Sequence, residues 1–269
     1  MHPKIQSEER LRTMEKVADL EVYVQRMQKS FMDKMFFIDK IFEPIDVILD
    51  FGCANGVLIR AMQYLFPEYE YIGYDISEDM IERAKELLPE CKFYKEWNAI
   101  AMDPKETLIN ISSTLHEVYS YGTEASVAEF WDRVFGSGFK YIAIRDMMVS
   151  ETVTGKADPS DVEKARKLFP EKLAEYESIW GSIEERFNLI HYLLKYSYTE
   201  NWEREVNENY LPLKVEALLR MIPEEYEIVY SEHYVLPYVK QQIKRDSGID
   251  LKDATHFKIL LKRKDERSL

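Results

Sequence analysis

Residues 49–56 read LDFGCANG, and they end an apolar, β-branched run that begins at residue 45. Such a run predicts a strand, whereas residues 58–65 have the apolar spacing of a helix. The two glycines between them predict a tight turn that approaches a ligand closely, because glycine has no Cβ to collide with it. This stretch therefore predicts a strand, a turn and a helix at the carboxyl edge of a sheet, where open α/β folds bind ligands.

The alternation of strands and helices continues outward from this turn. Ser77 has the position of a helix cap and is followed by two acids, and a further helix is predicted over residues 127–134. Besides the strand at 45–50, the pattern predicts strands at residues 69–76, 92–96, 107–113, 139–145, 226–236 and 255–262. We therefore predict an α/β fold with a doubly wound, mostly parallel seven-stranded sheet.

We expect residues 1–269 to form a single domain in four parts. Residues 1–40 are predicted as an N-terminal helical segment, with a helix over 4–36, and residues 41–149 as the core that binds a cofactor. After the fifth strand, residues 150–212 are predicted as a helical cap without a core of its own, with helices at 161–169, 171–180 and 183–206. Residues 213–269 complete the core with the last two strands.

Composition excludes several classes of protein. A hydrophobic share of 46% supports a folded core, and no window approaches the ~20 apolar residues of a membrane helix. The N-terminus has no secretion signal, and two cysteines are too few for a disulfide framework, so we expect a cytoplasmic protein. A net charge of −13 makes nucleic acid an unfavourable partner, although a local basic groove would still permit it.

The turn and a later acid indicate a nucleoside ligand. Asp75 ends the second predicted strand about 20 residues after the turn, the offset at which an acid accepts ribose hydroxyls in dinucleotide folds. The turn reads G-x-x-x-G, not the G-x-G-x-x-G of nicotinamide-binding proteins. Asp50 on the strand would repel a pyrophosphate but attract a sulfonium or an amino group.

The stretch resembles motif I of the class I S-adenosylmethionine-dependent methyltransferases, a strand ending in D-x-G-x-G-x-G, with Ala54 in place of one glycine. The resemblance covers about residues 45–146 and the last two strands. It implies an enzyme whose cofactor is S-adenosylmethionine, with Asp75 on the ribose. The residues implied to cradle the methionine end are Asp50, Gly52, Cys53, Ala54, Asn55 and Gly56.

Four further residues are assigned to the cofactor. Ile76 and Ser112 follow or end the second and fourth strands. Family members often place an acid or amide after the third strand against adenine, and Asn98 is our candidate, with Trp97 packing on the ring. The alternative for Asn98 is an ordinary turn asparagine.

The methyl acceptor is expected over the fourth and fifth strands. His116 and Glu117 resemble an H-E pair of some small-molecule methyltransferases, in which the histidine takes a proton from the acceptor; local packing is the alternative. Arg145 could clamp an anionic group of the acceptor or pair with neighbouring helices. The five histidines are scattered, so no catalytic metal is predicted.

The cap is expected to supply the acceptor pocket. Lys195, Tyr198 and Trp202 are predicted to face the transferable methyl, with Tyr119 beside them, because mixed polar and aromatic side chains line ligand pockets. The rival interpretation makes the cap an interface of a homodimer. The sequence thus predicts methylation of a small molecule; an RNA or protein acceptor, or a nucleoside-binding protein without activity, are the alternatives.

Overall fold

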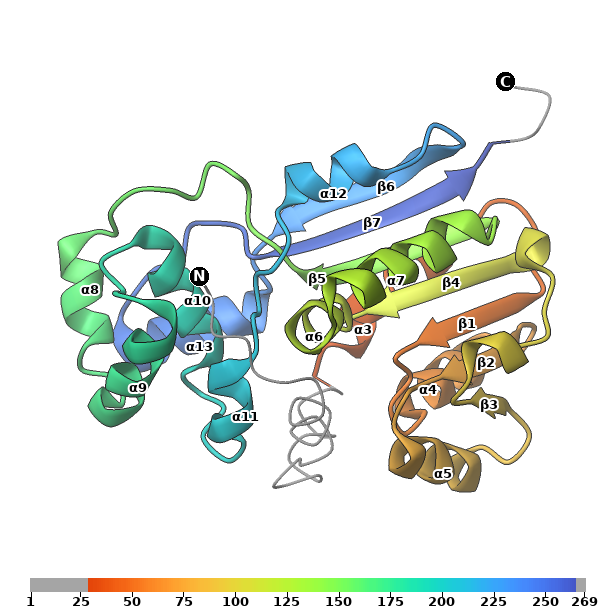
Figure 1. The fold of residues 1–269 in the computed structure, drawn as a ribbon, viewed down its shortest axis with the longest axis horizontal. Coiled ribbons are helices and arrows are strands. Elements are labelled where there is room, and N and C mark those ends of the chain that lie inside the picture. The colour runs from red at the N-terminus through yellow and green to blue at the C-terminus, as the bar shows by residue number, and fades with distance from the viewer. Residues whose placement is uncertain (1–28, 265–269) are drawn as a thin grey trace.

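The computed structural model describes residues 29–264 and contains one seven-stranded sheet of order β3-β2-β1-β4-β5-β7-β6 (Figure 1). Strands β1 to β5 are parallel, while β7 runs antiparallel to both β5 and β6. The strands are β1 (Val47–Phe51), β2 (Glu70–Tyr74), β3 (Lys92–Tyr94), β4 (Thr107–Ser112), β5 (Tyr141–Met147), β6 (Tyr226–Tyr234) and β7 (His256–Arg263). This sheet confirms the predicted fold class.

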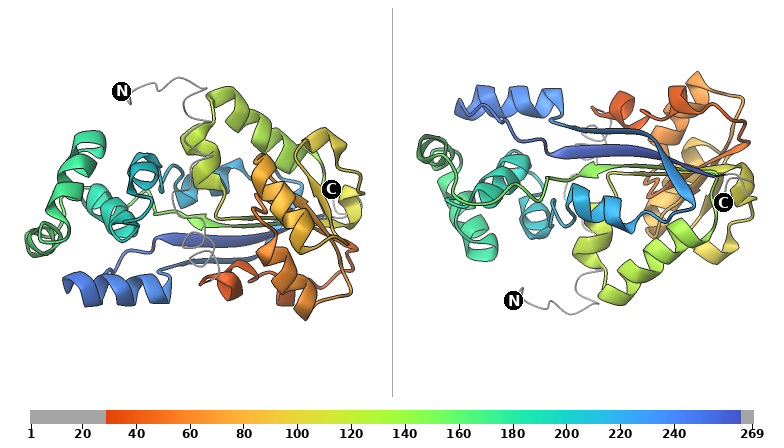
Figure 2. Two further views of the ribbon diagram at one scale, coloured as in Figure 1. Left: turned by 90° about the horizontal axis from the view of Figure 1, so that it is seen from below. Right: turned by 90° about the horizontal axis from the view of Figure 1, so that it is seen from above.

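Helices cover both faces of the sheet (Figure 2). One face packs against α3 (Phe31–Lys34), α4 (Val57–Leu65) and α5 (Glu78–Leu87), and the other against α6 (Leu115–Tyr121), α7 (Glu124–Gly136) and α12 (Val215–Met221). Successive side chains of a strand point to opposite faces, so Ile109 joins one hydrophobic cluster and Leu108 the other. Both faces of the central strands are buried, as expected for parallel strands.

The cap consists of α8 (Pro159–Ala165), α9 (Pro170–Trp180), α10 (Arg186–Lys195) and α11 (Trp202–Asn207). It lies beyond the carboxyl ends of β1 and β4 (Figure 1). Tyr176, Tyr192 and Val206 belong to a third hydrophobic cluster, to which Ile243 of α13 (Pro237–Ser247) also contributes. The expectation of a cap without its own core is therefore wrong, because these aromatic side chains pack on one another instead of on the sheet.

Several predicted elements differ from the observed ones. Residues 4–28 of the first predicted helix lie outside the described residues, and the described part ends at Lys34. The predicted helix 183–206 is two helices, because the Nζ of Lys195 donates to backbone carbonyls of Glu205 and Glu208 and so holds α11 back against α10. Helices α6, α12 and α13 are additional to the prediction. None of the helices within residues 29–264 is long and apolar enough to span a membrane.

Candidate active site

The turn after β1 has the predicted glycine-dependent geometry. Gly52, Ala54 and Gly56 have positive φ angles of 78°, 45° and 76°. Gly52 N and Cys53 N donate to the carbonyl of Tyr74 at 2.8 and 3.0 Å, which fastens the turn to the end of β2. A left-handed alanine costs roughly 1 kcal/mol relative to glycine, so the family's usual glycine would be less strained at position 54.

Asp75 connects this turn to the next helix. Its Oδ2 accepts a hydrogen bond from Ala54 N at 2.8 Å, and its Oδ1 accepts one from Ser77 N at 2.9 Å. Burial raises the pKa of Asp75, although these backbone donors oppose the shift. Each carboxylate oxygen has a second lone pair, so the side chain can hold the turn and still accept hydrogen bonds from a ligand.

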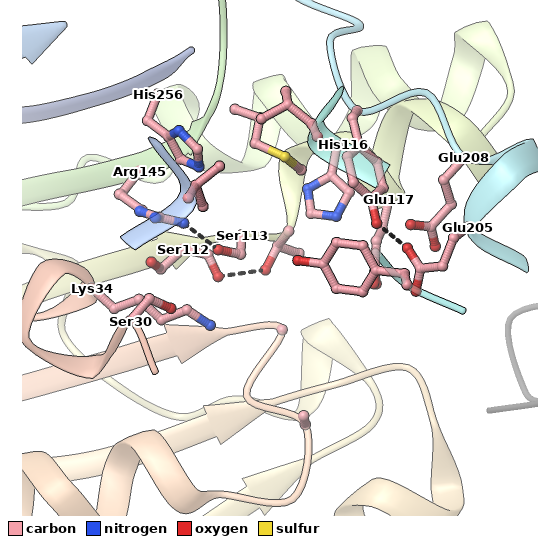
Figure 3. A pocket seen from close by; sticks show the side chains of 18 of the residues that line it. Ser30, Lys34, Ser112, Ser113, His116, Glu117, Arg145, Glu205, Glu208 and His256 are labelled. Atoms are coloured by element: carbon pink, nitrogen blue, oxygen red, sulfur yellow. Dashed lines mark hydrogen bonds between the residues drawn. The ribbon is translucent and has the colours of Figure 1, made fainter. Parts of the chain in front are cut away.

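Two adjoining cavities open above the turn. The first, of about 170 Å³, lies between the sheet and the cap (Figure 3). The second, of about 390 Å³, lies beside α6 and α7 and is lined mainly by apolar surface, including that of Phe51 and Val118. The residues that line both cavities are Gly52, Asp75, Thr114 and Glu117. Together they provide a continuous wall for one extended ligand or for two neighbouring ones.

The predicted cofactor residues divide into two groups. Gly52, Ala54, Asp75 and Ser112 line the first cavity, and Ile76 lines the second. The remaining predictions do not line either of these cavities; they are Asp50, Cys53, Asn55, Gly56, Trp97 and Asn98.

Two of these six residues, Asp50 and Trp97, have contacts within the core. Asp50 is buried and accepts from Asn110 Nδ2 at 2.7 Å, and burial raises its pKa to about 6. Trp97 packs on Phe51 and Tyr74, with ring centroids 5.8 and 5.5 Å away, so its role here is to support the turn from below.

His116 is held by a carboxylate from the neighbouring strand. Its Nδ1 lies 2.8 Å from Oδ1 of Asp146, and both side chains are buried. Burial alone would lower the pKa of His116, but the charge and hydrogen bond of Asp146, with Glu208 and Glu117 nearby, raise it to about 9. The imidazole is therefore protonated at neutral pH, which does not suit the predicted role as a general base.

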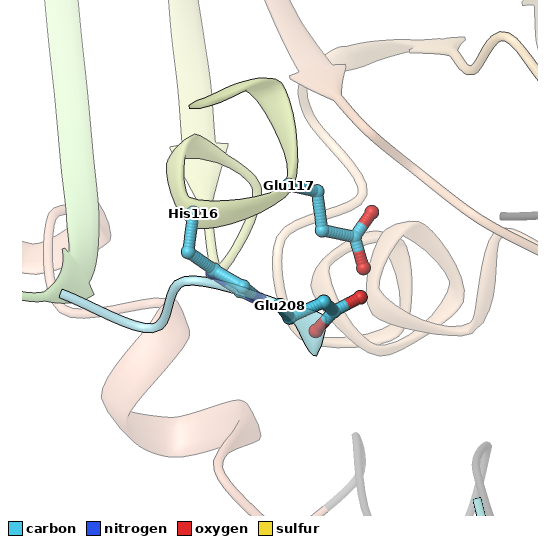
Figure 4. A group of neighbouring side chains, drawn as sticks. All are labelled: His116, Glu117 and Glu208. Atoms are coloured by element: carbon cyan, nitrogen blue, oxygen red, sulfur yellow. The ribbon is translucent and has the colours of Figure 1, made fainter. Parts of the chain in front are cut away.

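Glu117 meets a charged pair from the cap. Arg204 Nη2 lies 2.7 Å from Glu117 Oε1 and 2.8 Å from Glu208 Oε1. The hydroxyl of Tyr121 donates to Glu208 Oε1 at 2.6 Å. Burial raises the pKa of Glu208 to about 7, although Arg204 opposes the shift. His116, Glu117 and Glu208 thus form a compact cluster, which we call the HEE cluster (Figure 4).

The opposite end of the first cavity is rich in donors. Lys34 of α3 lies there, and burial lowers its pKa to about 8. Arg145 Nε donates to Asp33 at 2.8 Å and Nη1 to Ser113 Oγ at 2.7 Å, while Nη2 and the Oγ of Ser112 are buried without a described partner. Figure 3 shows Lys34, Arg145 and Ser112 on the same side of the cavity. This end is suited to an anionic group.

The predicted acceptor residues are only partly brought together. Tyr198 and Arg145 line the first cavity, whereas Lys195, Trp202 and Tyr119 do not. Lys195 is fully buried between the rings of Trp180 and Tyr210, because its ammonium group is used to join α10 and α11. Trp202 Nε1 donates to Glu175 at 2.7 Å. Tyr119 accepts from Trp131 Nε1 at 2.9 Å within the core.

Other residues of the first cavity were missed by the sequence analysis. They include Lys34, Arg204, Glu205, Glu208, Tyr210, Tyr238 and His256. Charged residues in helices usually face solvent, so nothing in the local sequence singles out Arg204 or Glu208. The sequence feature that could have indicated them is the acidic and aromatic composition at the end of the cap, just before the chain rejoins the core.

The fold and this cavity can be compared with known proteins. Residues 43–111 match the sequence family described as "Methyltransferase domain", the segment from β1 to β4. A comparison with curated protein sequences finds no match. The plantazolicin methyltransferase BpumL in complex with SAH is similar in structure, with a TM-score of 0.50 at 11% identity, covering 95% of this chain and 94% of that one.

Two further solved structures are similar over much of their length. The MccD protein has a TM-score of 0.46 at 11% identity, covering 86% of this chain and 96% of that one. The methyltransferase domain of bacterial CtHen1-C has a TM-score of 0.45 at 9% identity, covering 89% and 99%.

The matched segment contains the turn and Asp75, and the sheet has the seven mostly parallel strands that were predicted. Residues 43–111 thus match a methyltransferase domain, and the described chain has the α/β fold of one solved methyltransferase. The protein is an enzyme that transfers a methyl group, and S-adenosylmethionine is its cofactor.

Proposed function

We propose that this methyltransferase modifies a small molecule held in the first cavity, between the turn and the cap. The observation that carries the proposal is that Tyr198, Glu208 and Tyr210 of the cap region line the same cavity as Gly52 and Asp75. A wall contributed by the cap bounds the space beside the cofactor turn on one side. Such a wall would help to exclude water and to fix a small acceptor once the ligands are bound, which is what displacement at a methyl group requires.

The cofactor is proposed to lie across both cavities. Asp75, on the wall they share, would accept hydrogen bonds from the ribose hydroxyls, and the apolar second cavity with Ile76 and Val118 would take the adenine. Lys34 and Ser112, at the donor-rich end, would hold the methionine carboxylate. The left-handed backbone at Gly52 leaves room for the methionine chain to pass.

The acceptor is proposed to lie against the HEE cluster. The cofactor, when bound, would supply a methyl group activated by its sulfonium. The acceptor atom would lose one proton as it takes this methyl group, and a carboxylate of the HEE cluster would receive the proton. Glu208, with a pKa of about 7, is better suited to this than His116, whose imidazole already carries its proton.

Three wider expectations stay proposals. A single domain over residues 1–269 is supported by the cavity, to which the sheet, the cap and α13 all contribute. A cytoplasmic location rests on composition alone. A cap that forms the interface of a homodimer is the alternative to a cap that covers the acceptor pocket.

The acceptor class can be tested with cofactor that carries a labelled methyl group. The protein would be incubated with a cell extract that has been divided by size into small molecules and macromolecules. We expect label to enter the small-molecule fraction and to disappear when Gly52 is replaced by valine. Label confined to RNA or protein would contradict the proposal.

A further inference from the structure

The HEE cluster has the donor atoms of a metal site. His116, Glu117 and Glu208 each offer one ligand atom, and these three atoms lie within 4.8 Å of one another. Figure 4 shows the imidazole and the carboxylate of Glu117 coming from α6, while Glu208 reaches them from the segment after α11. An ion about 2.0–2.2 Å from each donor holds the donors roughly 3.0–3.5 Å apart, so a pair separated by 4.8 Å would have to close by more than about 1 Å on binding.

The histidine is oriented as a ligand would be. Nδ1 is engaged by Asp146, so Nε2 is the nitrogen left for the cluster, and the residue is 7% exposed. Among the contacts described for residues 29–264, no hydrogen bond is made by this Nε2. Histidines that bind metals almost always donate their other ring N–H to a carboxylate or carbonyl, which fixes the tautomer and the orientation of the ring. Asp146 already has this position.

The carboxylates keep one oxygen each for a further partner. Arg204 contacts both Glu117 and Glu208 through Oε1, and Tyr121 donates to the same oxygen of Glu208. Oε2 of each is therefore the oxygen left to another ligand. Arg204 balances the charge of one of the two carboxylates. The ion would take the place of the proton that His116 carries at neutral pH, because only the neutral imidazole binds a metal. Carboxylates suit Mn²⁺ and imidazole suits Zn²⁺ or Fe²⁺, so this mixed set of donors fits a divalent transition-metal ion.

We propose that His116, Glu117 and Glu208 bind a divalent transition-metal cation, for which Mn²⁺ is the probe. The sequence prediction of no metal depended on the spacing of histidines and did not include a carboxylate brought from the cap. The role of this ion rests on the proposed function: on the wall of the acceptor cavity, it would position an oxygen of the acceptor for methylation. With the ion bound, Glu208 would be its ligand instead of the proton acceptor, and the ion would lower the pKa of the acceptor oxygen so that its proton is lost to solvent. Binding of the ion itself does not depend on that role.

The test is a titration of the full chain with MnCl₂ alone, followed by electron paramagnetic resonance of the free ion. We expect one saturable site and competition by Zn²⁺. Glu208→Gln should weaken Mn²⁺ binding at least tenfold, and Asp146→Asn should weaken it about 10- to 100-fold through the orientation of the ring. Glu205→Gln is the matched control, because Glu205 lines the same cavity outside the cluster, and it should bind Mn²⁺ as the wild type does.

Circular dichroism of each variant establishes that it is folded. If Glu208→Gln does not fold, Glu117→Gln tests the same site from α6, where the side chain is only partly buried. No saturable site in the wild type, or equal loss in Glu205→Gln and the cluster variants, would overturn the proposal. Calorimetry with S-adenosylhomocysteine on the same preparations tests cofactor binding separately, so failure of the metal site and failure of the proposed function are distinguishable.

Discussion

Asp146 Oδ1 lies 2.8 Å from Nδ1 of His116, and Oδ2 of the same carboxylate accepts the backbone N–H of Leu115 at 2.7 Å. One buried side chain at the end of β5 therefore fixes both the start of α6 and the direction of the imidazole. This contact joins α6, which follows β4, to the end of the neighbouring strand β5. It holds His116 on the wall of the first cavity, where we propose that the acceptor binds.

Replacing Asp146 by asparagine should destabilise the fold substantially. It breaks a buried charged pair and leaves an imidazolium without its partner, which costs roughly 3 kcal/mol. Asp79→Asn removes an exposed carboxylate that pairs with Arg83, and it should cost less than about 1 kcal/mol. Urea unfolding of both variants measures the difference, and equal free energies of unfolding would show that the Asp146 pair contributes little.

Two substitutions at left-handed positions of the turn after β1 should differ in their effect on cofactor binding. A Cβ at Gly52 would lie 2.5 Å from Thr114 Oγ1, so Gly52→Ala should move Thr114, distort the turn and abolish binding of S-adenosylhomocysteine. Ala54→Gly relieves a positive φ and should leave that affinity within about threefold of wild type, since it affects no side-chain contact other than a methyl group. Calorimetry compares the two, and tight binding by Gly52→Ala would contradict the assigned path of the methionine chain.

The part of the fold near the turn could be predicted from local signals. The strand run, the glycine pair and the acid at the end of β2 are set by backbone geometry within about 25 residues, and such short-range constraints are visible in sequence. The cap was harder to predict from the sequence, because its buried charged residues pair with groups that are distant in the sequence. Lys195 reads as a polar pocket residue but is used to join two helices, and Glu208 reads as an exposed acid but is buried against α6.

Binding of S-adenosylhomocysteine should depend on pH through Lys34. Burial lowers the pKa of this amine to about 8 from about 10.5, so in the folded protein the cation that would hold the methionine carboxylate is lost as pH rises through 8. Affinity should therefore be highest below pH 8 and fall above it. The Lys34→Met variant should bind more weakly at pH 7, and its affinity should not fall further as pH rises through 8. This comparison separates the titration of Lys34 from that of the ligand's own amino group. Parallel curves for both proteins would show that Lys34 does not contact the ligand.

Tyr198 of the cap and Tyr119 of α6 can be distinguished by their positions. Tyr198 lines the first cavity, whereas Tyr119 is used within the core. Tyr198→Ala should lower methyl transfer to the small-molecule fraction at least tenfold while leaving the affinity for S-adenosylhomocysteine unchanged. Tyr119→Phe loses only the acceptor of the Trp131 hydrogen bond and should keep both properties. Normal transfer by a folded Tyr198→Ala variant would contradict a role of the cap in holding the acceptor, and would favour a larger acceptor or a cap that serves as an interface.

The central claim is that the turn and Asp75 bind the cofactor, and calorimetric titration with S-adenosylhomocysteine tests it most directly. The wild type should bind one equivalent. Asp75→Ala removes the carboxylate that would accept the ribose hydroxyls and should weaken binding by roughly 1.5–3 kcal/mol, about 10- to 150-fold. Unchanged affinity in a folded Asp75→Ala variant would remove that residue from the cofactor site. An absence of binding by the wild-type protein would contradict the account as a whole.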